Sequence, residues 1–332
     1  MQKREPHMIL AGDLGGTKTN LAYFGRKGDF LNLEMVGSYP SREYHSLGDI
    51  LDRMVKQHPA DITAAAFGIA GPVFHGKSRI TNLGWDVDAR ELASLLGLPA
   101  VGLLNDLEAT AYGTLRLARN DTVVINPGKP QAHGAIAVIA AGTGLGEGGL
   151  IWDGARYRAL ASEGGHADFA PHTELEIDLL RYLLRKHKHV SCERLVSGPG
   201  LYDIYQFFRL LTDHPEPAWL REQLSSGDPS AAVSQAGLEK KDAACERALD
   251  MFVTLYGAEA GNLALKLLAT GGVYVGGGIA PKILPKLHER FFLEAFLAKG
   301  RYEEFMATLP VLVIVNDKTA LLGAAHYAAT ML

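Results

Sequence analysis

Residues 8–24 read MILAGDLGGTKTNLAYF, in which two apolar runs flank a glycine-rich loop. The apolar run Met8–Ala11 predicts a buried strand, and Leu21–Phe24 predicts the strand that pairs with it as a hairpin. Glycines in the connecting loop can adopt positive φ and direct backbone N–H groups inward, which forms a cradle for an anion such as phosphate. An ordinary hairpin turn is the alternative. Asp13 favours the cradle, because an acid beside a phosphate is tolerated only with a divalent cation between them.

A second strand–glycine turn–strand unit repeats this pattern. Ala135–Ala140 predicts a strand, Ala141–Gly149 the turn, and Leu150–Trp152 the next strand. The turn contains the letters G-x-G-x-x-G, but that dinucleotide fingerprint requires a helix after its glycines, and a strand is predicted here. A third glycine turn, Gly276–Gly278, follows the predicted strand Val273–Val275. Two such hairpins and the third turn can hold a nucleotide from two sides.

Strand-like and helix-like patterns alternate along the chain, which is typical of an α/β fold with sheets covered by helices. The length of 332 residues exceeds the size at which one hydrophobic core stops growing, so we expect two lobes with a cleft between them. No low-complexity linker divides the chain. We therefore expect short connections between a small N-terminal lobe, residues 1–108 plus 319–332, and a large lobe, residues 109–318.

Several further elements follow from apolar runs and capping signals. Strands are expected at Ala64–Ala70 and Val101–Leu104, in the same sheet as the first hairpin, with a helix between them. Two pairs resemble capping boxes at helix starts, Asp88 with Glu91 and Thr173 with Glu176. The other predicted elements are a helix over residues 241–268, a strand at Val311–Val315 and a terminal helix from Ala320 to Ala329.

Composition and charge narrow the classes of function. The formal net charge is −4, and 47% apolar with 21% charged residues is typical of a soluble globular enzyme. The basic run Arg185–His189 closes a predicted helix and complements its dipole, so nucleic acid is not an expected partner. Cys192 and Cys245 lie far apart, which argues against a disulfide framework or a cysteine zinc site and fits a reducing compartment.

The N-terminal residues lack the apolar core of a signal peptide, because they are charged and the following apolar stretch is cut by Asp13. No segment is long and uncharged enough to cross a bilayer. We therefore expect a cytoplasmic protein with no membrane partner.

Asn105-Asp106 follows the predicted strand Val101–Leu104 and precedes an apolar helix. That places Asp106 where a strand becomes a helix, at the carboxyl edge of a sheet, which is where open α/β sheets bind ligands. The start of a helix favours an ionised carboxylate, which can accept a proton from an attacking hydroxyl. The dipeptide alone also fits a plain N-cap, for which Asn and Asp are preferred.

The segment Ser162–Asp168 is polar around two glycines, a composition suited to wrapping a hydroxylated ligand. Glu163 can accept two hydroxyl hydrogens, and His166 can accept or donate one. The close spacing of His166, Asp168 and His172 makes metal binding an alternative, although it matches no standard zinc pattern on a helix. A plain surface loop is the other alternative.

Taken in order, the motifs resemble those of the bacterial glucokinase family, in the actin/hexokinase/Hsp70-like ATPase superfamily, from about residue 8 to residue 330. They are Gly12–Thr17, Asn105-Asp106, Ala141–Gly146, Ser162–His166, Cys192–Gly200 and Gly276–Ile279. The resemblance implies a two-lobed α/β fold of the actin/hexokinase-like (ribonuclease H-like) type. It also implies an ATP-dependent kinase that transfers the γ-phosphate of ATP to the 6-hydroxyl of glucose, giving glucose 6-phosphate and ADP.

The same resemblance implies roles for individual residues. Nucleotide-binding residues would be Gly12, Asp13, Leu14, Gly15, Gly16 and Thr17 in the first phosphate loop, Gly142, Thr143 and Gly144 in the second, and Gly277 and Gly278 on the adenosine side. Asp106 would be the catalytic base. Glucose would be held by Asn82, Asn105, Asp106, Glu163, His166 and Glu193. Mg²⁺ would accompany ATP, held by Asp13 through water or phosphate, and the enzyme would be a homodimer.

The sequence departs from the neighbouring ROK sugar kinases, because Cys192 has no companion cysteines for the zinc motif expected there. The resemblance is therefore to the non-ROK type, without structural zinc. A sugar-responsive regulator would need a DNA-reading module, and a first strand near residue 8 leaves no room ahead of it for a helix-turn-helix. A non-sugar ATPase of the same fold stays open as an alternative, which sugar-stimulated ATP turnover would separate.

Overall fold

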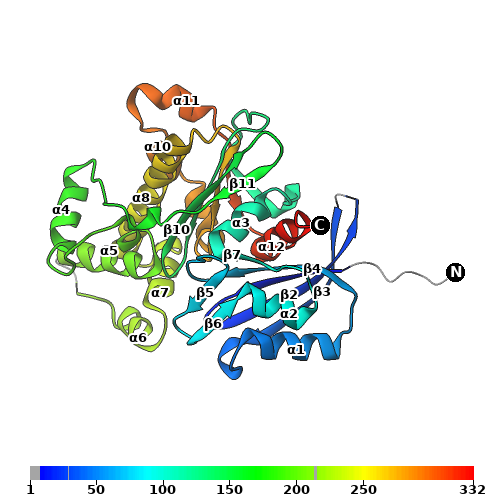
Figure 1. The fold of residues 1–332 in the computed structure, drawn as a ribbon. Helices are drawn as coiled ribbons and strands as arrows, with labels where there is room; N and C mark the ends of the chain where they lie inside the picture. The colour runs from blue at the N-terminus through cyan, green and yellow to red at the C-terminus, as the bar shows by residue number, and fades with distance from the viewer. Residues whose placement is uncertain (1–7, 29, 213–214) are drawn as a thin grey trace. The chain divides into compact units, whose positions relative to one another are not determined.

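The computed structural model describes residues 8–28, 30–212 and 215–332 (Figure 1). Contacts divide the chain into two compact units. The first unit contains the chain up to Asn120 together with Ala159–Ala161 and Asn316–Leu332, and the second contains Asp121–Arg158 and Ser162–Val315. The α/β class expected from the sequence is confirmed, and both large sheets are mixed.

The first unit is built on a five-stranded sheet in the order β3-β2-β1-β4-β7. The predicted hairpin is formed by β1 (Met8–Leu14) and β2 (Lys18–Lys27), and β2 also pairs antiparallel with β3 (Phe30–Pro40). On its other side β1 is parallel to β4 (Ile62–Ile69), which is parallel to β7 (Gly102–Asn105). Both further strands predicted for this sheet are thus confirmed.

Helices cover both faces of this sheet. Side chains alternate between the faces of β1, so Leu10 lies in one core cluster and Ile9 in another. Leu10 shares its cluster with α1 (Leu47–Gln57), whereas Ile9 shares its cluster with α12 (Thr319–Ala329). Figure 1 shows these two helices on opposite sides of the sheet. The predicted terminal helix is therefore confirmed, and it packs against one face of the first sheet.

The helix between β4 and β7 follows its predicted signals only in part. A short hairpin of β5 (Lys77–Ile80) and β6 (Trp85–Asp88) leads into α2 (Ala89–Leu96). The Asp88 carboxylate caps the helix by accepting from Arg90 N–H at 2.8 Å, and the helix ends at Gly97 in the left-handed conformation. The expected capping box does not close, because Asp88 accepts from Arg90 N–H and not from Glu91 N–H.

The start of α4 (Glu174–Leu183) shows a related difference. Thr173 Oγ1 accepts from Glu176 N–H at 3.2 Å, as predicted. The Glu176 carboxylate accepts from His172 N–H at 2.6 Å, one residue before the cap, so this box is not reciprocal. Both pairs are correct as N-cap signals and wrong as complete capping boxes.

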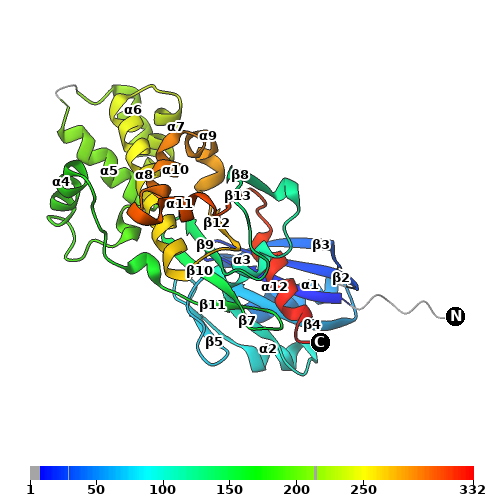
Figure 2. The same cartoon turned by 90° about the horizontal axis from the view of Figure 1, so that it is seen from above.

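The second unit repeats the strand order of the first. Its sheet runs β11-β10-β9-β12-β13-β8, and β9 pairs antiparallel with β10 and parallel with β12, as β1 does with β2 and β4. Figure 2 shows β10, β9, β12 and β13 side by side. The bounds are β8 Thr122–Asn126, β9 Ile136–Ala141, β10 Leu145–Trp152, β11 Tyr157–Leu160, β12 Gly272–Gly276 and β13 Val311–Ile314.

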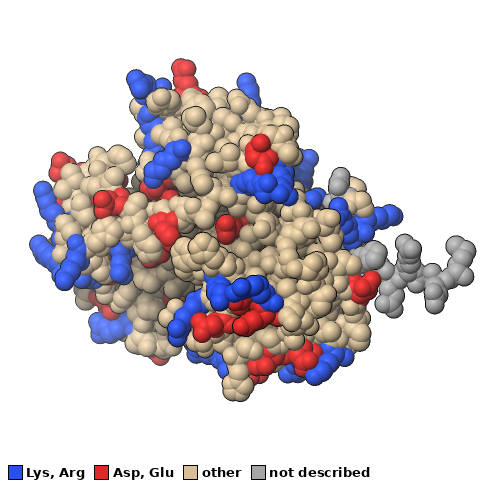
Figure 3. Space-filling view, in the orientation of Figure 1, with Lys and Arg blue, Asp and Glu red and all other residues tan. Residues whose placement is uncertain are grey.

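The core of the second unit surrounds the long helix α8, which the sequence predicted at residues 241–268. This helix, α8, spans Ala243–Leu267, and the unit also contains α5 Gly198–Leu210, α6 Ala218–Ser226, α7 Pro229–Leu238, α9 Leu284–Leu287, α10 Arg290–Leu297 and α11 Glu303–Ala307. Among the described residues, no helix has the length and apolar character needed to span a membrane. On the face drawn in Figure 3, basic and acidic side chains are interspersed.

Candidate active site

The first glycine turn is shorter than the sequence predicted. Because β1 continues to Leu14, Gly12 and Asp13 lie within a strand, and the turn comprises only residues 15–17. The expectation of positive φ in this loop is wrong, since neither Gly12 nor the two turn glycines has it. Gly12 is needed for packing, because a Cβ there would overlap the Phe67 ring.

Two buried hydroxyl groups, those of Ser41 and Thr19, hold this turn in place. Ser41 Oγ donates to the Gly15 carbonyl at 2.8 Å and lies 3.0 Å from Thr19 Oγ1, while Ser41 N–H donates to the Thr17 carbonyl at 3.0 Å. Both hydroxyl side chains are fully buried. Sequence reasoning missed Ser41, because nothing in the sequence links it to a turn 24 residues earlier.

Asp13 is half-buried beside the turn and lies opposite Asn20 in the hairpin. Burial raises the pKa of its carboxyl, and a hydrogen bond from Asn20 and the positive charge of Lys18 oppose the rise. A nearby cation would stabilise the ionised form. Mg²⁺ usually binds through one or two carboxylates together with substrate phosphates, and a single carboxylate beside an anion-binding turn fits that pattern.

The parallel strands bring Asp106 to the same sheet edge as this turn. In the register of the sheet, Leu14 pairs with Ile69 and Ile69 pairs with Asn105, so the ends of β1 and β7 are two strand spacings apart, about 10 Å. Asp106 is the first residue of α3 (Asp106–Thr114), and its Oδ1 accepts a hydrogen bond from Leu107 N–H at 2.9 Å.

Asn105 does form the N-cap that was the plainer interpretation. Its Oδ1 accepts from Glu108 N–H at 2.6 Å, and Glu108 Oε2 accepts from Asn105 N–H at 2.9 Å, which closes a full capping box. The positive end of α3 favours an ionised carboxylate at Asp106. Asn82 is exposed and lies beside the first turn, where a Cβ on Gly16 would be 3.6 Å from the Asn82 Cβ.

The second glycine turn comprises residues 142–144, because β10 begins at Leu145. Gly142 N–H donates to the Gly144 carbonyl, and Gly198 N–H donates to the Gly142 carbonyl, both at 2.8 Å. The later glycines of the predicted turn lie in β10. A strand follows the turn, which confirms the rejection of the dinucleotide fingerprint.

Tyr256 of α8 joins the second turn to the third. Its fully buried hydroxyl accepts from Ala141 N–H at 3.1 Å and lies 3.1 Å from the Gly276 carbonyl, to which it can donate. Gly277 has a φ of 82°, and a Cβ there would overlap the Ala141 carbonyl. Sequence reasoning missed Tyr256, although it predicted both turns that it connects.

These two turns open onto one pocket of about 750 Å³ in the second unit. Ligand pockets for small molecules usually measure about 300–1,000 Å³. The starts of α5 and α7 form its opposite wall. The polar side chains that line the pocket, of which only that of Thr143 was predicted, belong to Thr143, Tyr202, Asp228, Ser230, Ser234 and Lys282. The Asp228 carboxylate caps α7, and its hydrogen bond from Ser230 lowers its pKa.

The polar segments predicted to hold sugar are joined to each other. Glu163 precedes the short 3-10 helix Gly164–His166, and Glu193 lies in a second one, Cys192–Arg194. Cys192 N–H donates to the Ala167 carbonyl at 2.9 Å, which ties the two segments together. His166 Nδ1 and Glu193 Oε1 are 3.8 Å apart.

Glu193 also reaches the second glycine turn. Its Oε2 accepts from Leu145 N–H at 3.0 Å, and a Cβ on Gly144 would overlap this oxygen. The alternative metal site at His166, Asp168 and His172 is not formed, because the described residues contain no group of three or more potential metal ligands. The Asp168 carboxylate instead contacts His189 at 2.7 Å.

The first and second glycine turns follow equivalent strands, the second and third turns share a pocket, and a carboxylate–histidine segment adjoins the second turn. These are features of an ATP-dependent hexose kinase. A model of the glucokinase family matches residues 10–331. Glucokinases of Nostoc sp. and Synechocystis sp. are 44% and 42% identical to the chain, covering 98% and 97% of it and 99% and 98% of their own lengths. The chain belongs to the bacterial glucokinase family and is a glucose kinase.

Solved structures agree with this assignment. The glucokinase of an Antarctic psychrotroph superimposes with a TM-score of 0.86 at 29% identity, covering 97% of this chain and 99% of its own. A ROK family glucokinase from Streptomyces griseus, solved with glucose and AMPPNP, shares the fold at a TM-score of 0.66 and 22% identity, covering 97% of this chain and 99% of its own.

Proposed function

We propose that this kinase phosphorylates the 6-hydroxyl of glucose, with Asp106 as the general base. The position of Asp106 at the start of α3 supports an ionised carboxylate that can take the hydroxyl proton. Phosphoryl transfer needs little covalent chemistry from the protein, so positioning and charge stabilisation supply most of the catalysis.

The sugar is proposed to bind Glu163, His166 and Glu193, with Asn82 and Asn105 as further ligands. The observation that carries this proposal is the hydrogen bond from Leu145 N–H to Glu193 Oε2. It joins a segment suited to sugar hydroxyls to the turn suited to phosphate. Carboxylates accept hydroxyl hydrogens and imidazole can do either, so the segment offers complementary partners to a hexose.

ATP is proposed to place its adenosine in the 750 Å³ pocket, beside the turn that contains Gly277 and Gly278. Its phosphates would lie against the residues named in the two phosphate loops, Gly12–Thr17 and Gly142–Gly144. Asp13 would hold Mg²⁺ through water or phosphate, and the ion would neutralise charge that develops on the transferred group. Thr143 and Lys282 would add a hydroxyl donor and a positive charge within the pocket.

We propose that each large sheet carries the ribonuclease H-like fold of the actin and hexokinase class, because each has three strands joined to two further strands in the same order. The predicted lobes, residues 1–108 plus 319–332 and residues 109–318, stay a prediction. We also propose a homodimer that works in the cytoplasm, as the family resemblance implies. Analytical ultracentrifugation would test the dimer.

The test of the chemistry is ADP formation with Mg²⁺, with and without glucose, in the wild type and in Asp106→Asn. The amide keeps an oxygen that can accept from Leu107 N–H, so the fold should persist. Loss of a general base should lower kcat by about 10²- to 10⁴-fold. The KM for MgATP should change little.

A matched control is Asp317→Asn. Asn105-Asp106 lies at the end of β7, and Asn316-Asp317 lies one residue beyond the end of β13, the corresponding strand of the other sheet. The kcat of Asp317→Asn should stay near the wild-type value. Near-normal kcat in Asp106→Asn would contradict the assignment of the base, and ATP turnover indifferent to glucose would contradict the proposed function.

A further inference from the structure

Glu147 is a buried carboxyl that the proposed reaction does not use. It lies on β10, three residues after Gly144, and its side chain is 1% exposed. Its Oε1 has no hydrogen-bond partner among the residues that the structure describes. An ionised carboxylate that lacks both water and donors is costly, so the environment of Glu147 favours the neutral acid.

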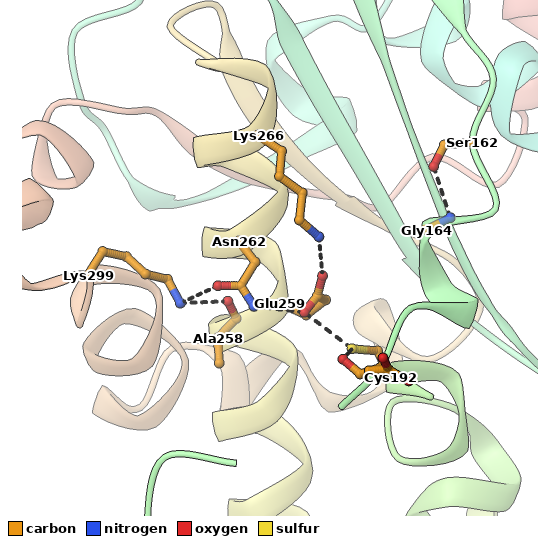
Figure 4. A network of polar contacts seen from close by, with 9 residues as sticks. Ser162, Gly164, Cys192, Ala258, Glu259, Asn262, Lys266 and Lys299 are labelled. Atoms are coloured by element: carbon orange, nitrogen blue, oxygen red, sulfur yellow. Dashed lines mark hydrogen bonds and ion pairs between the residues drawn. The ribbon is translucent and has the colours of Figure 1, made fainter. Parts of the chain in front are cut away.

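Glu259 of α8 is a second buried carboxyl next to Glu147. In contrast to Glu147, it is surrounded by hydrogen-bond donors. Its Oε2 accepts from Asn262 Nδ2 at 2.9 Å and from the Cys192 thiol at 3.3 Å. Its Oε1 pairs with Lys266 Nζ at 3.4 Å. Figure 4 shows all three donors directed at Glu259. Glu259 is therefore the ionised member, and a proton on Glu147 can be donated to it.

The two acids lie directly behind the segments assigned to sugar. A Cβ on Gly164 would overlap Glu147 Oε2, so a glycine at this position is what admits the carboxyl. Gly164 stands between Glu163 and His166 in the chain. Glu259 adjoins the other sugar segment, because it accepts from the thiol of Cys192, the residue immediately before Glu193.

We infer that Glu147 and Glu259 share one proton and that this acid pair positions the segments 163–166 and 192–194 for glucose. The inference rests on the proposed function of those segments. Both acids are positioning residues, because they act through the backbone of the segments and not on the sugar. When the proton is lost, two buried negative charges face each other and displace the segments that pack on them.

The charges around the pair set the direction of its pH response. Burial raises the pKa of Glu147 to about 7, the negative charge of Glu259 adds to the rise, and Lys266 opposes it. Burial and the same carboxylate raise the pKa of the Cys192 thiol, which therefore stays a neutral donor. Lys299 Nζ donates to Asn262 Oδ1 at 2.8 Å, and its positive charge also interacts with the Glu259 carboxylate. His172 lines the small cavity beside Cys192 and Glu259.

These charges determine whether glucose binding weakens at acid or at alkaline pH. A carboxyl whose folded pKa is raised holds its proton below that pKa and loses it as the pH rises. Glucose should therefore bind well at acid to neutral pH, and its KM should increase at alkaline pH. Glu147→Gln should abolish the increase, because the amide is neutral at every pH and still donates to Glu259.

The test is the KM for glucose from about pH 6 to about pH 9 in the wild type, Glu147→Gln and Glu216→Gln. Glu216 is the matched control, since its carboxylate accepts from Tyr205 Oη and belongs to no sugar segment. In the wild type and the control the KM should increase about fivefold or more, the lower end of usual coupling between two sites. In Glu147→Gln it should stay flat. Parallel profiles in all three proteins would overturn the inference.

Infrared difference spectra give a readout that needs no activity. The wild type near pH 6 should show the C=O band of a protonated carboxylic acid that is missing in Glu147→Gln, and absence of such a difference would also overturn the inference. If Glu147→Gln fails to fold, Glu259→Gln replaces it, because it too leaves at most one charge. A wild type that shows the band but no glucose-dependent ATP turnover would contradict the proposed function while leaving the shared proton in place.

Discussion

The Tyr256 hydroxyl joins two glycine turns, and its removal tests whether they work as one nucleotide site. Tyr256→Phe keeps the ring, which lies edge-on to Phe252 and Phe292 in the core. The substitution removes the acceptor of Ala141 N–H and the donor that faces the Gly276 carbonyl. The packing of the core therefore stays, and only the polar contacts of the hydroxyl are lost, including a longer one of 3.3 Å to the Ile139 carbonyl.

The structure sets the size of the effect. Ala141 is fully buried, so its N–H cannot turn to water when the acceptor is gone. A buried donor left without a partner costs about 1–3 kcal/mol, which makes local opening of β9 about 5- to 150-fold more frequent. The second turn then loses its hydroxyl link to the third and keeps the longer hydrogen bond from Ile279 N–H to the Ala141 carbonyl, at 3.3 Å. Because the connection between the turns is weakened, the KM for MgATP should rise. The KM for glucose should stay within about twofold.

Hydrogen–deuterium exchange of peptides that cover β9 and residues 142–144 measures the opening, and steady-state kinetics measure both KM values. Tyr205→Phe is the control, since it removes another buried hydroxyl, which donates to Glu216 at 2.7 Å. It should lower stability without changing the KM for MgATP. Unchanged exchange in β9 of Tyr256→Phe, or equal increases in both KM values, would refute the reasoning.

Two further predictions follow from the same contacts. Gly277→Ala places a side chain on a left-handed backbone, at a cost of about 1–2 kcal/mol, and the new Cβ overlaps the Ala141 carbonyl. The control is Gly278→Ala, where a Cβ meets nothing within 4 Å. The melting temperature of Gly277→Ala should therefore be well below that of the control. Glucose binding should take up protons above about pH 7, because it favours the protonated acid pair. Calorimetry in buffers of different ionisation enthalpy would measure this uptake, and an equal uptake by Glu147→Gln would contradict it.

The order of elements could be predicted because local signals and tertiary packing agree. Apolar runs, N-cap residues and Gly97 located four strands of each large sheet and several of the helices, whereas β3, β8 and β11 were not predicted. The extent of the glycine turns could not be predicted, since glycine serves turns and close packing equally well. Gly12 lies in a strand, and it is a glycine because the Phe67 ring fills the space of a side chain there, which is visible only once β1 and β4 are paired.

Prediction of the site was limited by long-range contacts. Ordered motifs indicated Asp106, Glu193 and the three turns, each of which is continuous in sequence. Ser41 and Tyr256 act on turns about 25 and 115 residues away, and neither belongs to a motif. Glu147 likewise reads as one polar residue in a glycine-rich strand until α8 brings Glu259 beside it.

The repeated sheet topology places an Asn-Asp pair after a corresponding strand twice, yet the local structure differs. Asn105 caps α3 directly, so Asp106 is the first residue of a helix whose free N–H groups stabilise its charge. Asn316 instead accepts from Lys318 N–H within a turn, and α12 begins only at Thr319. Asp317 is therefore an exposed residue outside the helix. Topology alone supplies a sheet edge, and Asp106, the proposed base, differs from Asp317 because a helix begins at the acid itself.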